Sequence, residues 1–168
     1  IDVGLVERKL GFPVVVKTLS GSQGSGVFLC EGRQNFEDLM ELIRATQSNA
    51  NLIFQEFIAD SRGRDIRIFV IGGRVVAAME RRSVNDNFKA NFSLGGEVVP
   101  FKPDRNAEWL ALESARLLGL DIAGIDLLFD GDGYKICEAN SSPGFEGIES
   151  CCDVDIAAEI LDFISFRL

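Results

Sequence analysis

The chain has 168 residues, of which 46% are apolar and 26% are charged, as in an ordinary globular domain. Its formal net charge of −9 argues against a nucleic-acid-binding surface, because phosphate contacts need clustered Lys and Arg. The sequence contains no His, which excludes a Ser-His-Asp or Cys-His nucleophile system. The Cys residues match no zinc-ligand spacing, so a metal here would be held by oxygen, as Mg²⁺, Mn²⁺ or Ca²⁺ are.

The first third of the chain predicts a hairpin, a helix and a further strand. A β-branched run after Pro13 reads as a strand, and a glycine-rich loop separates it from the next one. Asn35 is expected to cap a helix that continues to about Ser48. The predicted strands are Val14–Lys17, Val27–Glu31 and Leu52–Ile58, and the loop is Ser20–Gly26.

The remaining two thirds predict two more hairpins and two helices. Gly72-Gly73 and the segment Asp130–Gly133 are strong turn signals. Asn106 is expected to cap a helix that Gly119 ends, and Asp153 to cap a final amphipathic helix. The predicted strands are Asp65–Ile71, Arg74–Arg82, Ile122–Phe129 and Tyr134–Ala139, and the predicted loops are Ser83–Gly96 and Pro143–Glu149. Antiparallel hairpins with interspersed helices predict an α+β architecture.

Three polar side chains of the last hairpin form a candidate metal site. Glu138 and Asn140 are two residues apart at a strand end and therefore share a face, and Asp126 lies in the preceding strand. Two carboxylates and an amide oxygen suit a hard divalent cation. From the strand pattern alone, a solvated sheet face explains these residues equally well.

The early strand and loop form a candidate phosphate site. Lys17 ends a strand that leads into a loop whose small residues let backbone N–H groups approach phosphate oxygens. No Lys-Ser or Lys-Thr follows the last glycine, and the glycines do not open a helix, so neither a Walker A loop nor a dinucleotide fingerprint is present. An ordinary turn remains the alternative.

Other residues extend this set. The strand around Glu56 and Phe57 could face an adenine ring, or be an ordinary core strand. Asp65 and Arg67 share one strand face, as do Glu80 and Arg82. The arginines could neutralise a transferring phosphoryl group, although cross-strand salt bridges are an equal alternative.

The order of these motifs resembles the ATP-grasp superfamily, and within it RimK-type ligases. The resemblance covers nearly the whole chain and rests on Val-Val-Val-Lys17, the glycine loop, Gln-Glu56-Phe57, Gly-Arg-Asp65-Ile-Arg67, Lys89-Ala-Asn91, Ala-Gly-Ile-Asp126 and Glu138-Ala-Asn140-Ser-Ser-Pro-Gly. It implies an ATP-grasp fold with two subdomains of mainly antiparallel sheet and helices, with the nucleotide held between them. It assigns residues 1–58 to a partial small subdomain and residues 59–168 to the C-terminal subdomain, and the N-terminal domain of family members is expected to be absent from this chain.

The resemblance also implies residue roles and a reaction. Nucleotide contacts fall to Lys17, Glu56, Phe57, Asp65, Lys89, Ala90 and Asn91; the Mg²⁺ or Mn²⁺ ligands are Asp126, Glu138 and Asn140; catalytic contacts to the γ-phosphate or acyl phosphate fall to Arg67 and Arg82. The implied enzyme is an ATP-dependent carboxylate–amine ligase acting through an acyl phosphate. Its expected partners are an amino acid, such as glutamate, and a protein or small-molecule acceptor.

Further expectations concern the location, the oligomeric state and the acceptor. The longest apolar stretches are strand-sized, so no membrane association is expected and the cytoplasm is the default location. A homo-oligomer is expected only by family analogy. RimK-like sequences commonly have Arg at the position of Lys89, and bacterial protein-glutamylating members tend to have His and Arg at those of Ser93 and Leu94, which leaves the acceptor open.

The alternative function is a nucleotide-binding regulatory module without ligase activity. A third hypothesis is a structural or interaction domain whose acids are merely solvated.

Overall fold

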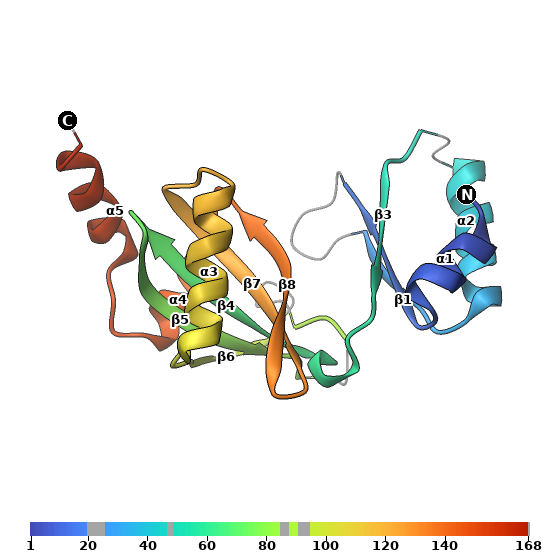
Figure 1. Ribbon diagram of the computed structural model, residues 1–168, viewed down its shortest axis with the longest axis horizontal. Helices are drawn as coiled ribbons and strands as arrows, with labels where there is room; N and C mark the ends of the chain where they lie inside the picture. Colours follow the sequence, from blue (N-terminus) through green and yellow to red (C-terminus); the bar gives the residue numbers. More distant parts are fainter. Residues whose placement is uncertain (20–25, 47–48, 85–87, 91–94, 168) are drawn as a thin grey trace. The chain divides into compact units, whose positions relative to one another are not determined.

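The computed structural model describes residues 1–19, 26–46, 49–84, 88–90 and 95–167. These residues form two compact units, Ile1–Phe57 and Ile58–Leu168 (Figure 1). The α+β fold class is confirmed, because both units consist of an antiparallel sheet and helices. No described helix is both long and apolar enough to span a membrane.

The first unit is a three-stranded antiparallel sheet packed against two helices. The strand order is β2-β1-β3, with β1 in the centre. Val14 and Val16 are fully buried against the helices, whereas Val15 and Lys17 alternate onto the other face. The elements are α1 (Val3–Leu10), β1 (Val14–Thr18), β2 (Val27–Cys30), α2 (Arg33–Thr46) and β3 (Leu52–Glu56).

Both helices of the first unit differ from the sequence-based expectation. Helix α1 was not predicted, although Asp2 is a regular N-cap whose side chain accepts a hydrogen bond from the Leu5 backbone N–H at 3.1 Å. Helix α2 begins at Arg33, so the expectation that Asn35 caps it was wrong. Asn35 lies exposed within the first turn, and the Phe36 N–H donates to the carbonyl oxygen of Gly32 at 3.2 Å.

The second unit contains a five-stranded antiparallel sheet with the order β6-β5-β4-β7-β8. The two long predicted hairpins are confirmed, with β4 paired to β5 and β7 paired to β8. Strand β6 is a short edge strand that was not predicted. The elements are η1 (Ala59–Ser61), β4 (Arg64–Ile71), β5 (Arg74–Arg82), β6 (Glu97–Pro100), α3 (Arg105–Leu117), β7 (Ile122–Asp130), β8 (Gly133–Asn140), α4 (Glu146–Cys151) and α5 (Ile156–Ser165).

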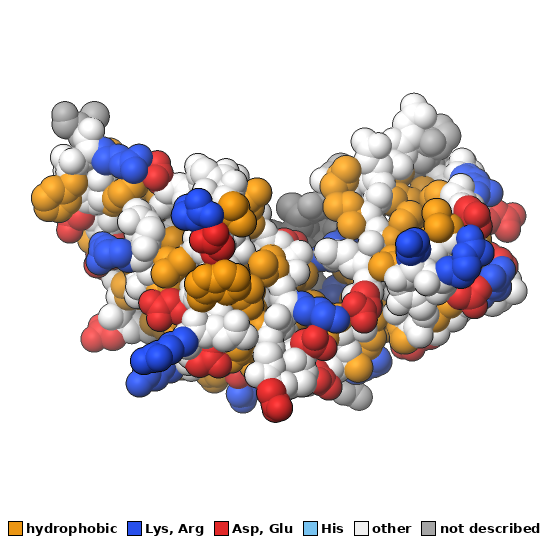
Figure 2. All heavy atoms as spheres, viewed as in Figure 1, with side chains coloured by type: hydrophobic (Ala, Val, Ile, Leu, Met, Phe, Trp, Pro, Cys, Tyr) orange, Lys and Arg blue, Asp and Glu red, His pale blue; other side chains and the backbone are white. Residues whose placement is uncertain are grey.

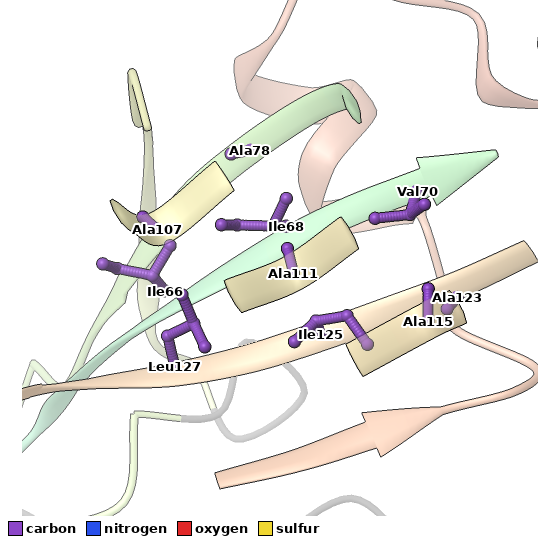
Figure 3. Packing of buried hydrophobic residues seen from close by; sticks show 10 residues of the cluster. All are labelled: Ile66, Ile68, Val70, Ala78, Ala107, Ala111, Ala115, Ala123, Ile125 and Leu127. Atoms are coloured by element: carbon purple, nitrogen blue, oxygen red, sulfur yellow. The ribbon is translucent and has the colours of Figure 1, made fainter. Parts of the chain in front are cut away.

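Helix α3 covers one face of this sheet, here called the α3 face. Its alanines Ala107, Ala111 and Ala115 point at branched side chains of β4 and β7, such as Ile68 and Ile125 (Figure 3). All of these residues are at most 2% exposed. Small residues on the helix let it approach the sheet closely, so this packing fixes the positions of β4 and β7.

The opposite face of the sheet is divided between apolar and polar residues. Phe69, Ile71 and Met79 pack with Ile148 of α4 and Ile156 of α5. Further along β4 the same face carries ionisable side chains, which are described below. The apolar half of this face therefore packs against α4 and α5, while the polar half carries the ionisable side chains.

The helix caps of the second unit also required correction. Asp104, and not Asn106, caps α3, because its Oδ1 accepts from the Ala107 N–H at 2.8 Å. Asp155, and not Asp153, caps α5 in the same way. Gly119 follows the end of α3 with a positive φ of 66°, as expected for a glycine that ends a helix. The expected loop over residues 143–149 contains the start of α4.

Gly124 in β7 lies where the backbone needs a residue without a side chain. A Cβ atom at this position would lie 2.7 Å from Cβ of Pro143 and 3.6 Å from Nε of Arg67. Gly124→Ala is therefore expected to lower the free energy of unfolding by about 1–3 kcal/mol, as overpacking does. Urea denaturation followed by circular dichroism measures this change. Gly133→Ala is the matched control, because its Cβ would meet its nearest atoms at 3.8 Å; equal effects of the two variants would contradict the steric explanation.

Candidate functional site

The last hairpin places the three predicted metal ligands on one face of the five-stranded sheet. Asp126 of β7 pairs directly with Glu138 of β8, and Gly124 pairs with Asn140. Residues directly opposite each other in an antiparallel pair point to the same side. The Asn140 amide Nδ2 lies 3.3 Å from Oε1 of Glu138, to which it donates a hydrogen bond. The hairpin thus brings the three side chains to one place.

Asp126 is buried and is held by two arginines. Arg67 of β4 donates from Nε to Oδ1 and from Nη2 to Oδ2 of Asp126, both at 2.7 Å. Arg81 of β5 donates from Nη2 to Oδ2 of the same carboxylate at 2.8 Å. Burial alone would raise the pKa of Asp126, but the charges of Arg81 and Arg67 outweigh it and hold the pKa below its usual range. Asp126 is therefore a stable carboxylate, although only 3% of its surface is exposed.

Arg81 also binds Asp65, so that four side chains form one network. Its Nε donates to Oδ1 of Asp65 at 2.6 Å and its Nη2 to Oδ2 at 2.9 Å. We refer to Asp65, Arg67, Arg81 and Asp126 as the network. Burial raises the pKa of Asp65 to about 6, with the Asp126 charge acting in the same direction and only Arg81 and Arg67 opposing them. The two carboxylates thus differ, because Asp126 has two arginine partners and Asp65 has one.

The raised pKa of Asp65 predicts a particular pH dependence of stability. Between about pH 6 and its ordinary pKa of 3.8, the folded protein binds a proton at Asp65 that the unfolded chain does not, so this residue adds stability as the pH falls. The unfolding free energy of wild type minus that of Asp65→Asn is expected to grow by about 1 kcal/mol from pH 7 to pH 5. Urea denaturation at the two pH values measures it. A difference that shrinks toward pH 5 would show that Asp65 stays ionised.

The donor set fits a hard divalent cation. Glu138 is an exposed carboxylate, Asn140 offers an amide oxygen, and Asp126 is an ionised carboxylate beside them. The site carries three acids, Asp65, Asp126 and Glu138, against the two arginines of the network. One negative charge is thus left over to attract a cation. No three Asp, Glu or Cys side chains form a metal cluster by themselves within the described ranges, so a cation bound here would need the amide oxygen of Asn140 as a third ligand.

Arg82 does not join Arg67 at the network. Its Nε and Nη2 donate to the two carboxylate oxygens of Glu80, each at 2.9 Å. Glu80 pairs with Ile66, so both Glu80 and Arg82 lie on the α3 side of the sheet, opposite to Asp65 and Arg67. The expected contact of Arg82 with a transferred phosphoryl group remains a prediction, which this geometry does not favour.

Sequence reasoning missed Arg81 because β5 contains a bulge. The register of β4 and β5 shifts between Phe69 and Val70, so that Phe69 pairs with Ala77 and Val70 with Val75. Val76 is the extra residue. Without Val76, the register set by the Gly72-Gly73 turn would place Glu80 opposite Asp65, with Arg82 on the same face of the sheet. The extra residue shifts the register of β5 by one, which exchanges the faces on which its side chains lie. The one available signal was the strand alternation itself, which puts Arg81 and Arg82 on opposite faces.

The predicted nucleotide residues of the first unit lie on two faces of its sheet. Lys17 pairs with Val27 and Ile53 on the face away from the helices. Glu56 pairs with the buried Val14 at the opposite end of β3 and is exposed, and Phe57 follows directly after the strand. Ser20–Ser25 of the glycine loop lie outside the described residues. The nucleotide contacts of these side chains therefore remain predictions.

The predicted Lys89-Ala-Asn91 segment is described only in part. Lys89 is half-buried, with its Nζ 5.6 Å from the ring centre of Phe88, and burial lowers its pKa. Ala90 is 5% exposed. The carbonyl oxygen of Phe88 accepts from the N–H of Gly63 at 3.2 Å, which places the segment beside the start of β4. Asn91 lies outside the described residues.

The fold defined by these elements is that of the ATP-grasp ligases. It is similar to an ATP-grasp ligase, PsnB, solved with precursor peptide PsnA2 and AMPPNP, with a TM-score of 0.70 and 25% identity over 98% of this chain and 49% of that one. It is also similar to the D-alanine–D-alanine ligase of Bacillus anthracis, with a TM-score of 0.72 and 17% identity over 98% of this chain and 56% of that one.

Sequence comparison narrows the class to one family. The model of the RimK-like ATP-grasp domain matches residues 3–164, and the chain belongs to this family. A "Probable alpha-L-glutamate ligase" of Rhodopirellula baltica is 44% identical over 97% of this chain and 40% of its own length. A relative of the same name from Picosynechococcus is 41% identical over 96% of this chain and 53% of its own length. The chain thus spans about half the length of the curated relatives, or less, and the resemblance seen in its motifs is confirmed.

Proposed function

We propose that this chain is the part of an ATP-dependent carboxylate–amine ligase that holds the divalent cation and the transferred phosphoryl group. The observation that carries the proposal is the convergence of Asp126, Glu138 and Asn140 beside Arg67 and Arg81, in a chain of the RimK-like ATP-grasp family. Acids alone would repel ATP. Carboxylates that can hold a cation, with the guanidinium group of Arg67 beside them, suit a triphosphate and its metal ion.

The proposed reaction has two steps. An oxygen of the substrate carboxylate attacks the γ-phosphorus of ATP, which forms an acyl phosphate and releases ADP. The amine of the acceptor then attacks the acyl carbon, phosphate leaves, the nitrogen loses a proton, and an amide is formed. No covalent protein nucleophile is required, which agrees with a sequence that contains no His.

The residues of this chain would bind and orient charged groups. Asp126, Glu138 and Asn140 would hold Mg²⁺ or Mn²⁺, which when bound neutralises phosphate charge. Arg67, at 15% side-chain exposure, would stabilise charge on the phosphoryl group from its fixed position beside Asp126. Lys17, Glu56, Phe57, Asp65, Lys89, Ala90 and Asn91 remain the proposed nucleotide contacts.

The donor acid is proposed to be glutamate or a similar amino acid, joined to a protein or small-molecule acceptor. The names of the curated relatives, alpha-L-glutamate ligases, support glutamate. A peptide acceptor is supported by the precursor peptide in the PsnB complex. ATP and free amino acids as substrates favour the cytoplasm as the place of action.

Turnover by the full-length protein tests the proposal. ADP release would be measured with Mg·ATP, each of a panel of amino acids and candidate acceptors, and the product identified by its mass. ADP release that depends on glutamate and yields an amide is the expected result. Nucleotide binding by calorimetry without release of ADP under any of these conditions would instead identify a regulatory nucleotide-binding module.

A further inference from the structure

Arg81 is the most completely enclosed cation of the network. It is 5% exposed and donates three hydrogen bonds of 2.6–2.9 Å to two different carboxylates, those of Asp65 and Asp126. Among the described residues, Arg67 in contrast donates to Asp126 alone, through a two-bond fork. Burying a charged group costs free energy unless its donors are hydrogen-bonded, and apolar residues could fill the same space. The buried guanidinium of Arg81 therefore indicates a role that apolar side chains could not perform.

The geometry of Asp126 shows what Arg81 does to it. Each carboxylate oxygen can accept two hydrogen bonds. Oδ2 of Asp126 accepts from Nη2 of Arg67 and from Nη2 of Arg81, whereas Oδ1 accepts only from Nε of Arg67 among the described residues. Arg81 therefore saturates one oxygen and leaves the other with an acceptor position.

The same guanidinium fixes the second carboxylate. Nη2 of Arg81 donates to both Oδ2 of Asp65 and Oδ2 of Asp126. Neither aspartate side chain can therefore rotate without breaking its hydrogen bond to this shared nitrogen. The planar fork of Arg can serve two acids at once, whereas the point charge of Lys cannot reproduce both sets of directed bonds.

We propose that Arg81 is a positioning residue that directs Oδ1 of Asp126 toward the divalent cation and holds Asp65 in register with it. The inference rests on the proposed function, because it takes Asp126 as a ligand of the cation. Arg81 would contact neither the cation nor the phosphoryl group. It acts through Asp126, as residues that support a metal ligand do.

Cation binding by variants of the full-length protein tests the inference. Mn²⁺ would be titrated in the presence of saturating ADP and followed by electron paramagnetic resonance, and the Mg²⁺ dependence of ADP release would be measured in parallel. Arg81→Gln is expected to weaken Mn²⁺ binding by about tenfold or more, with Arg81→Lys intermediate. In turnover, the apparent Mg²⁺ activation constant should rise by a similar factor, while kcat at saturating Mg²⁺ changes less.

Arg74→Gln is the matched control, because Arg74 starts the same strand and its side chain is 69% exposed beside Glu159. It is expected to bind Mn²⁺ as wild type does. Circular dichroism establishes whether each variant is folded. If Arg81→Gln does not fold, the Mn²⁺ affinity of Arg81→Lys tests the inference. A folded Arg81→Lys protein with wild-type Mn²⁺ affinity would overturn the inference.

The outcomes separate this inference from the proposed function. Wild-type protein that releases ADP, with Mn²⁺ affinity unchanged in the Arg81 variants, supports the ligase and overturns the role of Arg81. Wild-type protein that binds Mn²⁺ with ADP but never turns over ATP, with binding weakened in the Arg81 variants, supports the role of Arg81 and overturns the ligase. Wild-type protein that binds no Mn²⁺ with ADP overturns the inference.

Discussion

Replacing Glu138 with glutamine is expected to lower ADP release by the full-length protein by about a hundredfold or more. The change removes one of two carboxylates in the proposed cation site while it keeps the size of the side chain. Loss of residues that merely support metal ligands already costs ten- to a hundredfold in metal affinity or activity, so loss of a ligand should cost at least as much. ADP release at fixed Mg·ATP, and its recovery at raised Mg²⁺, would be measured.

The exposure of Glu138 makes this variant informative, because a surface carboxylate is not required for folding. The melting temperature without nucleotide should therefore stay near that of wild type. Glu108→Gln makes the same chemical replacement at an exposed position of helix α3, and this variant should release ADP at the wild-type rate. ATP turnover that survives in Glu138→Gln at limiting Mg²⁺ would exclude Glu138 as a cation ligand.

Asp126→Asn is expected to lower the free energy of unfolding by about 3–5 kcal/mol. Asparagine fills nearly the same space, but its amide group is neutral and turns an NH₂ donor toward arginines that can only donate. Arg81 would then keep Asp65 as a carboxylate partner, whereas Arg67 would lose the carboxylate that its Nε and Nη2 bind. Breaking a buried ion pair from one side has an effect of this size, because the remaining charge loses its partner. Urea denaturation in the absence of metal and nucleotide measures it.

An exposed ion pair provides the comparison for Asp126→Asn. Glu113 and Arg116 form a fork-like pair on the surface of α3, where water solvates both groups. Glu113→Gln should leave the denaturation midpoint unchanged within error, since exposed pairs contribute little. If Asp126→Asn were as mild as Glu113→Gln, the network would not contribute to stability in solution.

Most of the fold could be predicted because local signals and hydrophobic patterns agree. Gly72 and Gly73 both adopt positive φ, of 57° and 75°, as a two-residue hairpin turn requires. The helix starts were less predictable. Asn35, Asn106 and Asp153 are all suitable caps by residue type, but Asp104 and Asp155 stand directly before the first residue of their helices and accept from the N–H three residues on. Residue type alone does not distinguish neighbouring candidates of this kind.

The candidate site was predictable at Asp126, Glu138 and Asn140 and less so at the arginines. The last hairpin keeps Asp126 opposite Glu138, although the register shifts directly after this pair. In β5 the bulge lies between the turn and the site, so counting back from the glycines gives the wrong face for Arg81 and Arg82. Bulges have no firm sequence signature at β-branched residues such as Val76, and only the paired strands reveal them.

The two edge strands of the sheet in the second unit have features that hinder pairing with another chain. Charged side chains of both signs are interspersed with apolar ones over the face seen in Figure 2. Of the two outer strands, β6 has four residues and ends in Pro100, which cannot donate a backbone hydrogen bond. The eight-residue β8 is the longer edge, and it carries Lys135, Glu138 and an irregularity at Cys137.

These features of β8 discourage another chain from adding a strand there. Glu138, which is proposed to hold the cation, would thus also limit self-association of the protein. Apolar replacements of Lys135 and Glu138 would remove two charges from this edge strand, and concentrated protein would then be prone to self-association during refolding.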